Sequence, residues 1–277
     1  MRRDVTAALD VTVQSSSRFV FIVAAAARPA AESLRVVHEG SGQLYPAELV
    51  DSHGTRVHSL YAPPGRLCVE YSATLTGDPF HAFGDAGSDD AEQSSAAVDE
   101  LDAIRYLRPS RYCQSDALVP TAAAEFSGLS GAGLLLAVRN WVSRQLSYVP
   151  GSSRPTDGAI DTLLGRAGVC RDYAHLVIAL LRAVDVPARL AAVYAPGLSP
   201  MDFHAVAEAY IDGAWYVVDA TGLAPRQQMV RIATGRDAAD TAFMSAYEGR
   251  SLLDRVTVTA VADTLSQDDP ETLVQLS

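Results

Sequence analysis

The segment GRAGVCRDYAHLVIALLRAV, residues 165–184, places one cysteine, Cys170, between a glycine-rich approach and a long apolar run. After this cysteine, apolar side chains recur at three- and four-residue spacing, which is typical of a buried helix. The glycines before it permit close approach of the backbone. The pattern therefore predicts a core helix over residues 170–184 with a thiol in its first turn.

The position of the Cys170 thiol has two interpretations. Unpaired backbone N–H groups and the positive end of the helix dipole lie at a helix start, and both favour a thiolate. The same N–H groups can stabilise a developing oxyanion. In the other interpretation, the cysteine is a small apolar side chain that only packs against the core. A histidine and a carboxylate within reach of the thiol would favour catalysis.

A second segment, DFHAVAEAYIDGAWYVVDATG, residues 202–222, supplies such a pair. Its Asp212-Gly213 dipeptide is a strong hairpin signal. With that turn, Asp219 lies opposite Val206 and diagonal to His204, at a Cα separation of about 7–8 Å. Asp219 can then fix the tautomer of His204 and stabilise its imidazolium. A register shift of one residue would move Asp219 to the opposite face of the sheet.

The other titratable residues in these segments fit a catalytic role less well. Glu208 shares the face but lies two rungs further from His204 along the ladder, which makes it the weaker orienting acid. His175 follows Cys170 by five residues, about 140° around a helix, so it points elsewhere and is interpreted as a core or surface histidine. Asp172 is interpreted as an acid that stabilises the first helical turn.

Composition limits the class of partner. The chain has 277 residues and a net charge of −11, and all 22 basic side chains are arginine. An acidic protein of this kind offers no basic footprint for nucleic acid or an anionic membrane, so we expect neither as a partner. No apolar run approaches the ~20 residues that span a bilayer.

The cysteines indicate neither a disulfide framework nor a metal site. Cys68, Cys113 and Cys170 are odd in number and widely spaced, and they form no zinc-like pattern with the histidines. We therefore expect a reduced, cytoplasmic protein without a metal or cofactor. The sequence leaves the oligomeric state open.

The organisation along the chain predicts an α+β protein in which an antiparallel β domain precedes a catalytic domain. We expect an N-terminal β-rich domain at 1–83, an acidic linker and crossover at 84–116, a catalytic domain at 117–262 and a polar, fraying tail at 263–277. Expected strands are at 11–14, 19–25, 34–38, 47–51, 55–61, 66–76, 189–194, 204–211, 215–219, 229–233 and 256–261. Expected helices are at 117–126, 131–148 and 170–184.

Three pieces of the sequence, GVCRDYAH, DFHAVAEAY and WYVVDATG, resemble in chain order the Cys, His and Asp segments of the transglutaminase-like superfamily. The likeness is greatest to its bacterial branch of transglutaminase-like cysteine proteases, and the β-rich first part resembles the N-terminal region of that branch. The resemblance implies a papain-like core, with a nucleophile-bearing helix packed on an antiparallel sheet. It also implies that Cys170 is the nucleophile, His204 the general acid/base and Asp219 its orienting acid.

The sequence departs from the family pattern at two places near these residues. Val206-Ala207 stands where the family usually has an aromatic residue, and Ala220 stands where it often has proline. The backbone N–H of Cys170 is one expected oxyanion donor. Tyr148 and Trp141 are the candidates for a second donor, and the alternative for both is aromatic packing at a helix end.

Two functions follow from these features. The first is a cysteine peptidase, amidase or acyl transferase that attacks a carboxamide or peptide bond of a protein or peptide substrate and forms a thioester. We favour hydrolysis over amine transfer because nothing in the sequence identifies an amine-binding site. The second is a catalytically weak or inactive binding or scaffolding module that retains the fold.

Overall fold

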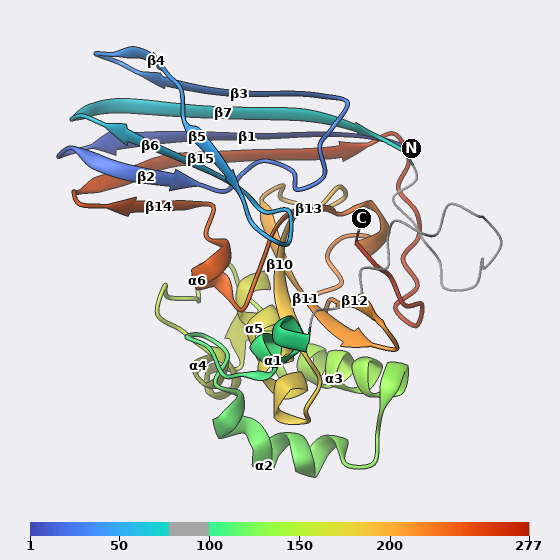
Figure 1. The fold of residues 1–277 in the computed structure, drawn as a ribbon. Helices are drawn as coiled ribbons and strands as arrows, with labels where there is room; N and C mark the ends of the chain where they lie inside the picture. Colours follow the sequence, from blue (N-terminus) through green and yellow to red (C-terminus); the bar gives the residue numbers. More distant parts are fainter. Residues whose placement is uncertain (78–99, 277) are drawn as a thin grey trace.

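The computed structural model describes residues 1–77 and 100–276 and has the α+β fold that the sequence predicts (Figure 1). Two β-sheets form one part of the molecule, and the helices gather around a third sheet in the other. Residues 84–99 of the expected linker and crossover, 84–116, lie outside the described residues. The described chain resumes at helix α1 (Glu100–Leu107).

The β part consists of two antiparallel sheets that share one apolar core. Side chains in the long strands alternate between buried and exposed, as in sheets with one face on a core. The core contains Phe19 and Leu67, one from each sheet. The first sheet has the order β15-β1-β7-β3-β4, and the second has the order β14-β2-β6-β5. Their strands are β1 (Arg2–Val13), β2 (Ser17–Phe21), β3 (Ala31–His38), β4 (Gly42–Leu44), β5 (Ala47–Val50), β6 (Arg56–Ala62), β7 (Gly65–Thr76), β14 (Met244–Tyr247) and β15 (Ser251–Ala262).

The last two strands return to the first sheets, which corrects the expected placement of the 256–261 strand in the catalytic domain. β15 runs antiparallel to β1 over its whole length, and β14 pairs with β2. The alternating pattern of such a strand predicts a half-buried position but does not say which sheet edge it joins. The part of the chain that contains Cys170, His204 and Asp219 therefore lies between β7 and β14.

The expected fraying tail is also corrected, because residues after β15 pack back onto the structure. The Val274 side chain is fully buried, and its carbonyl accepts a hydrogen bond of 2.8 Å from the backbone N–H of Val217. Asp268 pairs with the guanidinium of Arg226 at 2.9 Å. Polar composition alone did not reveal these anchors.

The part of the chain between β7 and β14 is built on a four-stranded antiparallel sheet with the order β12-β11-β10-β13. Its strands are β10 (Ala188–Tyr194), β11 (Phe203–Ile211), β12 (Ala214–Val218) and β13 (Val230–Gly235), and a short 3-10 turn occupies Arg226–Gln228. Helices α2 (Ser115–Phe126), α3 (Gly131–Gln145), α4 (Ala159–Gly165), α5 (Cys170–Ala183) and α6 (Ala238–Thr241) lie around it, and β8 (Ser147–Tyr148) pairs with β9 (Ala167–Gly168).

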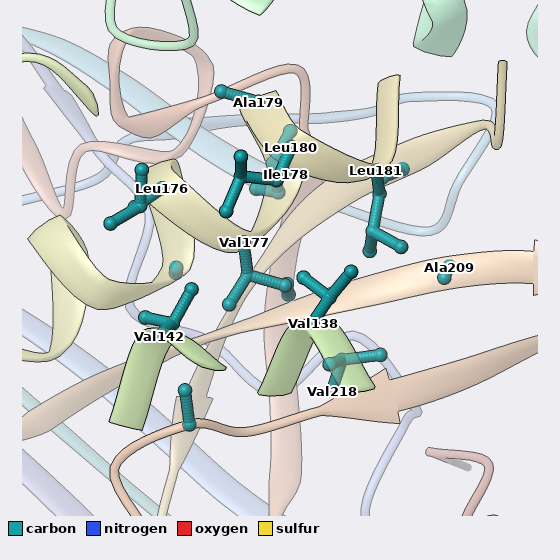
Figure 2. Close-up of a cluster of buried hydrophobic side chains, with 14 of the residues drawn as sticks. Val138, Val142, Leu176, Val177, Ile178, Ala179, Leu180, Leu181, Ala209 and Val218 are labelled. Atoms are coloured by element: carbon teal, nitrogen blue, oxygen red, sulfur yellow. The ribbon is translucent and has the colours of Figure 1, made fainter. Parts of the chain in front are cut away.

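Helix α5 is the central element of this core. The expected helix at 170–184 is confirmed, and its residues from Asp172 to Arg182 are all buried. Figure 2 shows Val177 and Leu181 of α5 near Val138 of α3 and Val218 of β12. A helix buried on nearly every side is held rigidly by its neighbours, so the position of its first residue is well defined.

Several short elements were not predicted from the sequence. They include α4, β4, α6 and the β8–β9 pair, each of which is too short to show a periodic pattern of apolar residues. Within residues 1–77 and 100–276, no single helix is long and apolar enough to cross a membrane. Only α2 and α3, bent by 106° to each other, reach that length and apolarity as a pair.

Candidate active site

The thiol of Cys170 lies at the start of α5, as the sequence predicts. Asp172 closes the helix start, because its carboxylate accepts hydrogen bonds from the backbone N–H of Val169 at 2.8 Å and from the Ser153 hydroxyl at 2.9 Å. A Cβ atom at Gly168 would lie 2.7 Å from the Cβ of Asp172, so only glycine fits there. Asp172 therefore has the helix-capping role expected for it.

The hairpin has the register that the sequence predicts. Asp212 and Gly213 form the turn with φ of 50° and 84°, as a two-residue type I′ turn requires. β11 pairs with β12 from Ile211–Ala214 down to Ala207–Val218, so the next rung would set Val206 against Asp219. The imidazole of His204 and the carboxylate of Asp219 consequently meet, with Nε2 3.7 Å from Oδ2. A spacing slightly longer than a hydrogen bond is common in active sites without ligand.

The Asp219 carboxylate is held from its far side. Its Oδ1 accepts hydrogen bonds from the backbone N–H of Thr221 at 2.8 Å and from the Thr221 hydroxyl at 2.7 Å. The guanidinium of Arg139 donates to the Asp219 carbonyl at 2.9 Å. Burial raises the pKa of Asp219, but His204 and Thr221 outweigh it, so the pKa is lowered and the group is a carboxylate. Its other oxygen, Oδ2, is left to face the imidazole.

The sequence analysis missed both of these supporting residues. Asp-x-Thr is a recognisable turn pattern in which the aspartate accepts from the residue two positions on, so Thr221 could have been found. Arg139 comes from α3, about 80 residues earlier in the chain, and no local pattern connects it to Asp219.

His204 is fully buried and its pKa is strongly perturbed. Burial lowers the pKa, but the Asp219 carboxylate and the Cys170 thiol together raise it to about 10. The imidazolium form is therefore favoured when a carboxylate and a sulfur anion lie beside the ring. Since Nε2 faces Asp219, Nδ1 is the ring nitrogen that remains for the thiol.

The two candidates for a second oxyanion donor lie in different places. Tyr148 belongs to β8, whose parallel pairing with β9 brings it opposite Gly168, two residues before Cys170. Burial and the Cys170 thiol raise the pKa of the Tyr148 phenol to about 12, and a hydrogen bond from the Cys170 backbone N–H partly offsets them. Trp141 instead packs in the core, edge-on to Phe126 at 6.0 Å between ring centres. The structure thus brings Tyr148, but not Trp141, to the thiol.

The competing residues have structural partners of their own. Glu208 is fully buried and forms ion pairs with Arg189 at 2.8 Å and Arg231 at 2.7 Å. Burial raises the pKa of Glu208, but these two guanidinium groups lower it to about 2. His175 stacks on Tyr112 at 5.1 Å, and burial lowers its pKa to about 3, so it is a neutral core residue. Neither side chain is directed at the thiol.

A pocket of about 330 Å³ opens beside the nucleophile, and Cys170 and His204 both line it. Its other walls are mainly apolar. Among the described parts of the chain, 1–77 and 100–276, no three His, Cys, Asp or Glu side chains are grouped to hold a metal ion. The arrangement can attack a carbonyl with sulfur, move one proton through a buried imidazole and hold an oxyanion near the start of α5.

Comparison with known proteins agrees with this geometry. A family model described as the transglutaminase-like superfamily matches residues 123–220, a span that includes Cys170, His204 and Asp219. A solved structure of a "putative cysteine protease" from Cytophaga hutchinsonii is 33% identical in sequence, with a TM-score of 0.84; the match covers 100% of this chain and 98% of that one. "Uncharacterized protein ML0607" from Mycobacterium leprae is 26% identical over 220 residues, which are 74% of this chain and 77% of that protein. The chain belongs to the transglutaminase-like superfamily.

Proposed function

We propose that the protein is a transglutaminase-like cysteine enzyme that cleaves a carboxamide or peptide bond through Cys170, His204 and Asp219. The observation that carries the proposal is the alignment of three groups. The His204 ring lies 3.7 Å from the Asp219 carboxylate, and it lines the same pocket as the Cys170 thiol. Such an alignment matches the general pattern of a nucleophile, a base and a group that orients the base.

In the proposed reaction, His204 already holds the Cys170 proton on Nδ1 as the imidazolium, and the sulfur anion attacks the substrate carbonyl carbon. The backbone N–H of Cys170 and the Tyr148 hydroxyl stabilise the resulting oxyanion. His204 then protonates the departing nitrogen, and a thioester remains on Cys170. Water next attacks the thioester and gives a proton to His204, and the sulfur leaves as the anion beside the restored imidazolium. Asp219 stabilises the imidazolium throughout.

We favour water over an amine as the acceptor. None of the described residues that line the pocket carries a carboxylate, so the pocket wall offers no negative charge to an incoming ammonium group. Water needs no such negatively charged binding site, so the reaction we propose is hydrolysis. The substrate we propose is a protein or peptide.

The test uses the three free cysteines as internal references. Native protein is treated with iodoacetamide over a range of pH, and alkylation of Cys68, Cys113 and Cys170 is followed by peptide mass spectrometry. Burial raises the pKa of Cys68, and raises that of Cys113 to about 12, so both are slow references. Near neutral pH, we expect Cys170 to be alkylated faster than Cys68 and Cys113. Its alkylation should be slower in His204→Ala. The matched variant His53→Ala removes a half-buried histidine of the β part, outside the pocket beside Cys170.

A second measurement addresses the thioester. p-Nitrophenyl acetate should acetylate Cys170 in the wild type, and the acetyl group should then be lost to water. Transfer to added glycine methyl ester would identify an amine acceptor instead. The enzyme proposal is wrong if Cys170 is alkylated no faster than Cys68, if its alkylation rate is unchanged in His204→Ala, and if it forms no acetyl thioester. The inactive binding or scaffolding module would then account for the fold.

A further inference from the structure

The pocket beside Cys170 is assembled from both parts of the molecule. The core sheet contributes Leu190 of β10, Phe203 of β11 and Ile232 of β13. Another part of the wall is formed by Ile22, which directly follows β2, and by Phe243 and Met244, where the chain enters β14. Since β2 and β14 pair in the second β-sheet, this sheet supplies one wall of the pocket.

The wall of the pocket is suited to an apolar group. Phe203 and Phe243 stack with ring centres 5.0 Å apart, which joins the two parts of the wall through an aromatic contact. Two of the polar side chains on the wall, those of Arg171 and Tyr112, make hydrogen bonds within the protein. The Arg171 guanidinium donates to the Ser153 hydroxyl and to the Arg154 carbonyl, and the Tyr112 hydroxyl donates to the Pro155 carbonyl at 2.9 Å.

We propose that this pocket binds a large apolar side chain of the substrate, next to the carbonyl that Cys170 attacks. The substrate class is therefore a peptide or amide with an aromatic or branched aliphatic side chain flanking the reacting bond. A volume of about 330 Å³ accommodates a group of that size. The inference rests on the proposed function, because it assigns the selectivity of the same thiol. It also makes the β part a contributor to specificity.

The size of the effect follows from the burial of apolar surface. A single methylene in an apolar enzyme pocket changes selectivity by about 10- to 200-fold. A benzyl group in place of a methyl group should therefore increase the rate constant at limiting reagent by at least about tenfold, even if it fills the pocket only in part. A carboxylate of similar length should give no gain, since the two cationic side chains on the wall, Arg171 and His204, already face Asp172 at 3.3 Å and Asp219 at 3.7 Å.

The test compares three alkylating reagents that differ only in the group on nitrogen: N-methyl-, N-benzyl- and N-carboxymethyl-iodoacetamide. Rates at Cys170 and Cys68 are read from the same sample by peptide mass spectrometry. In the wild type we expect the benzyl reagent to exceed the methyl reagent at least tenfold at Cys170, with saturation, and to show no preference at Cys68. This comparison needs no variant.

Two substitutions then locate the preference. Ala242→Trp should fill the pocket and reduce the benzyl-to-methyl ratio to near one, whereas Ala124→Trp on the exposed face of α2 should leave it unchanged. Phe243→Ala should enlarge the pocket and move the preference to an N-naphthylmethyl reagent. The ratio is informative even if a variant is less stable, because both reagents are measured on the same protein.

The outcomes separate this inference from the proposed function. Rapid alkylation of Cys170 with a benzyl-to-methyl ratio near one in the wild type would overturn the pocket inference and leave the enzyme proposal standing. A wild-type preference that Ala242→Trp does not reduce, in a variant that melts as a folded protein, would also overturn the pocket assignment. Slow reaction of Cys170 with every reagent, relative to Cys68, would overturn both.

Discussion

Replacing the Asp219 carboxylate tests most directly whether this group controls the pKa of His204. Asp219→Asn keeps the shape of the side chain and an oxygen that can accept from Thr221, which now holds Oδ1 at 2.7–2.8 Å. The negative charge beside the His204 ring is lost. We therefore expect the fold to persist and the pKa of His204 to fall.

The magnitude follows from the geometry. Two unit charges about 4 Å apart interact by about 4 kcal/mol at the effective dielectric constant of about 20 that suits protein sites. The ring nitrogen and carboxylate oxygen are 3.7 Å apart, which is close to that separation. Since 1.36 kcal/mol corresponds to about one pKa unit, the pKa of His204 should fall by about 3. From about 10 it would reach about 7, close to that of an ordinary histidine.

The pKa can be measured directly by NMR of the imidazole C–H signals as the pH is raised. His204 is identified as the signal that is missing from His204→Ala, among the six histidines of the chain. Wild-type His204 should stay protonated until the pH approaches about 10, whereas in Asp219→Asn it should titrate near neutrality. Asp116→Asn, at an exposed position of α2, is the matched control and should leave the titration unchanged.

The sign of the linked stability provides an independent check. A raised histidine pKa stabilises the folded protein fully below the unfolded value of 6.5, and the effect is lost as the pH rises through about 10. The wild type should therefore lose stability over that range more steeply than Asp219→Asn. A His204 pKa that differs by less than half a unit between the two proteins would refute the reasoning, because Asp219 would then not govern the ring.

The remaining predictions concern the core, a buried ion network and the oxyanion donor. Leu180→Ala removes a fully buried side chain of α5 and should lower the free energy of unfolding by about 3 kcal/mol in urea titrations. Glu208→Gln should cost a similar amount, about 3 kcal/mol near pH 7, by leaving Arg189 and Arg231 without their carboxylate. That difference should shrink as the pH falls from about 4.5 towards 2, where wild-type Glu208 itself becomes protonated. Tyr148→Phe should slow acetylation by p-nitrophenyl acetate about 100-fold while alkylation by iodoacetamide changes little, since only the former develops an oxyanion.

The pairing of His204 with Asp219 could be predicted because both the turn and the ladder are local. Asp212-Gly213 specifies a two-residue turn, and counting along two strands then fixes which residues face each other. The start of α5 was equally readable, since the periodic apolar run begins directly after Cys170. In such segments, the spacing of residues in the sequence is enough to predict which residues are neighbours in space.

Contacts between distant segments could not be predicted in this way. The expected helix at 131–148 ends instead at Gln145, and the following residues form β8, which is what carries Tyr148 to the thiol. The ion pairs of Glu208 depend on Arg189 and Arg231, which lie on separate strands of the sheet. The pocket wall at Ile22 depends on a sheet whose last strand, β14, follows the whole core sheet in the chain. No periodicity specifies these pairings.

The return of β14 and β15 to the first sheets also sets an order of events during synthesis. Ile22 is synthesised before α5 and the core sheet, but its neighbours in the same pocket wall, Phe243 and Met244, follow only after both have been made. β1 and β2 can pair with β7 and β6, but the other edge of each strand stays unpaired until β15 and β14 emerge. Helix α5 is thus synthesised before Phe243 and Met244, so a nascent chain carries the Cys170 thiol before the wall of the pocket beside it is complete.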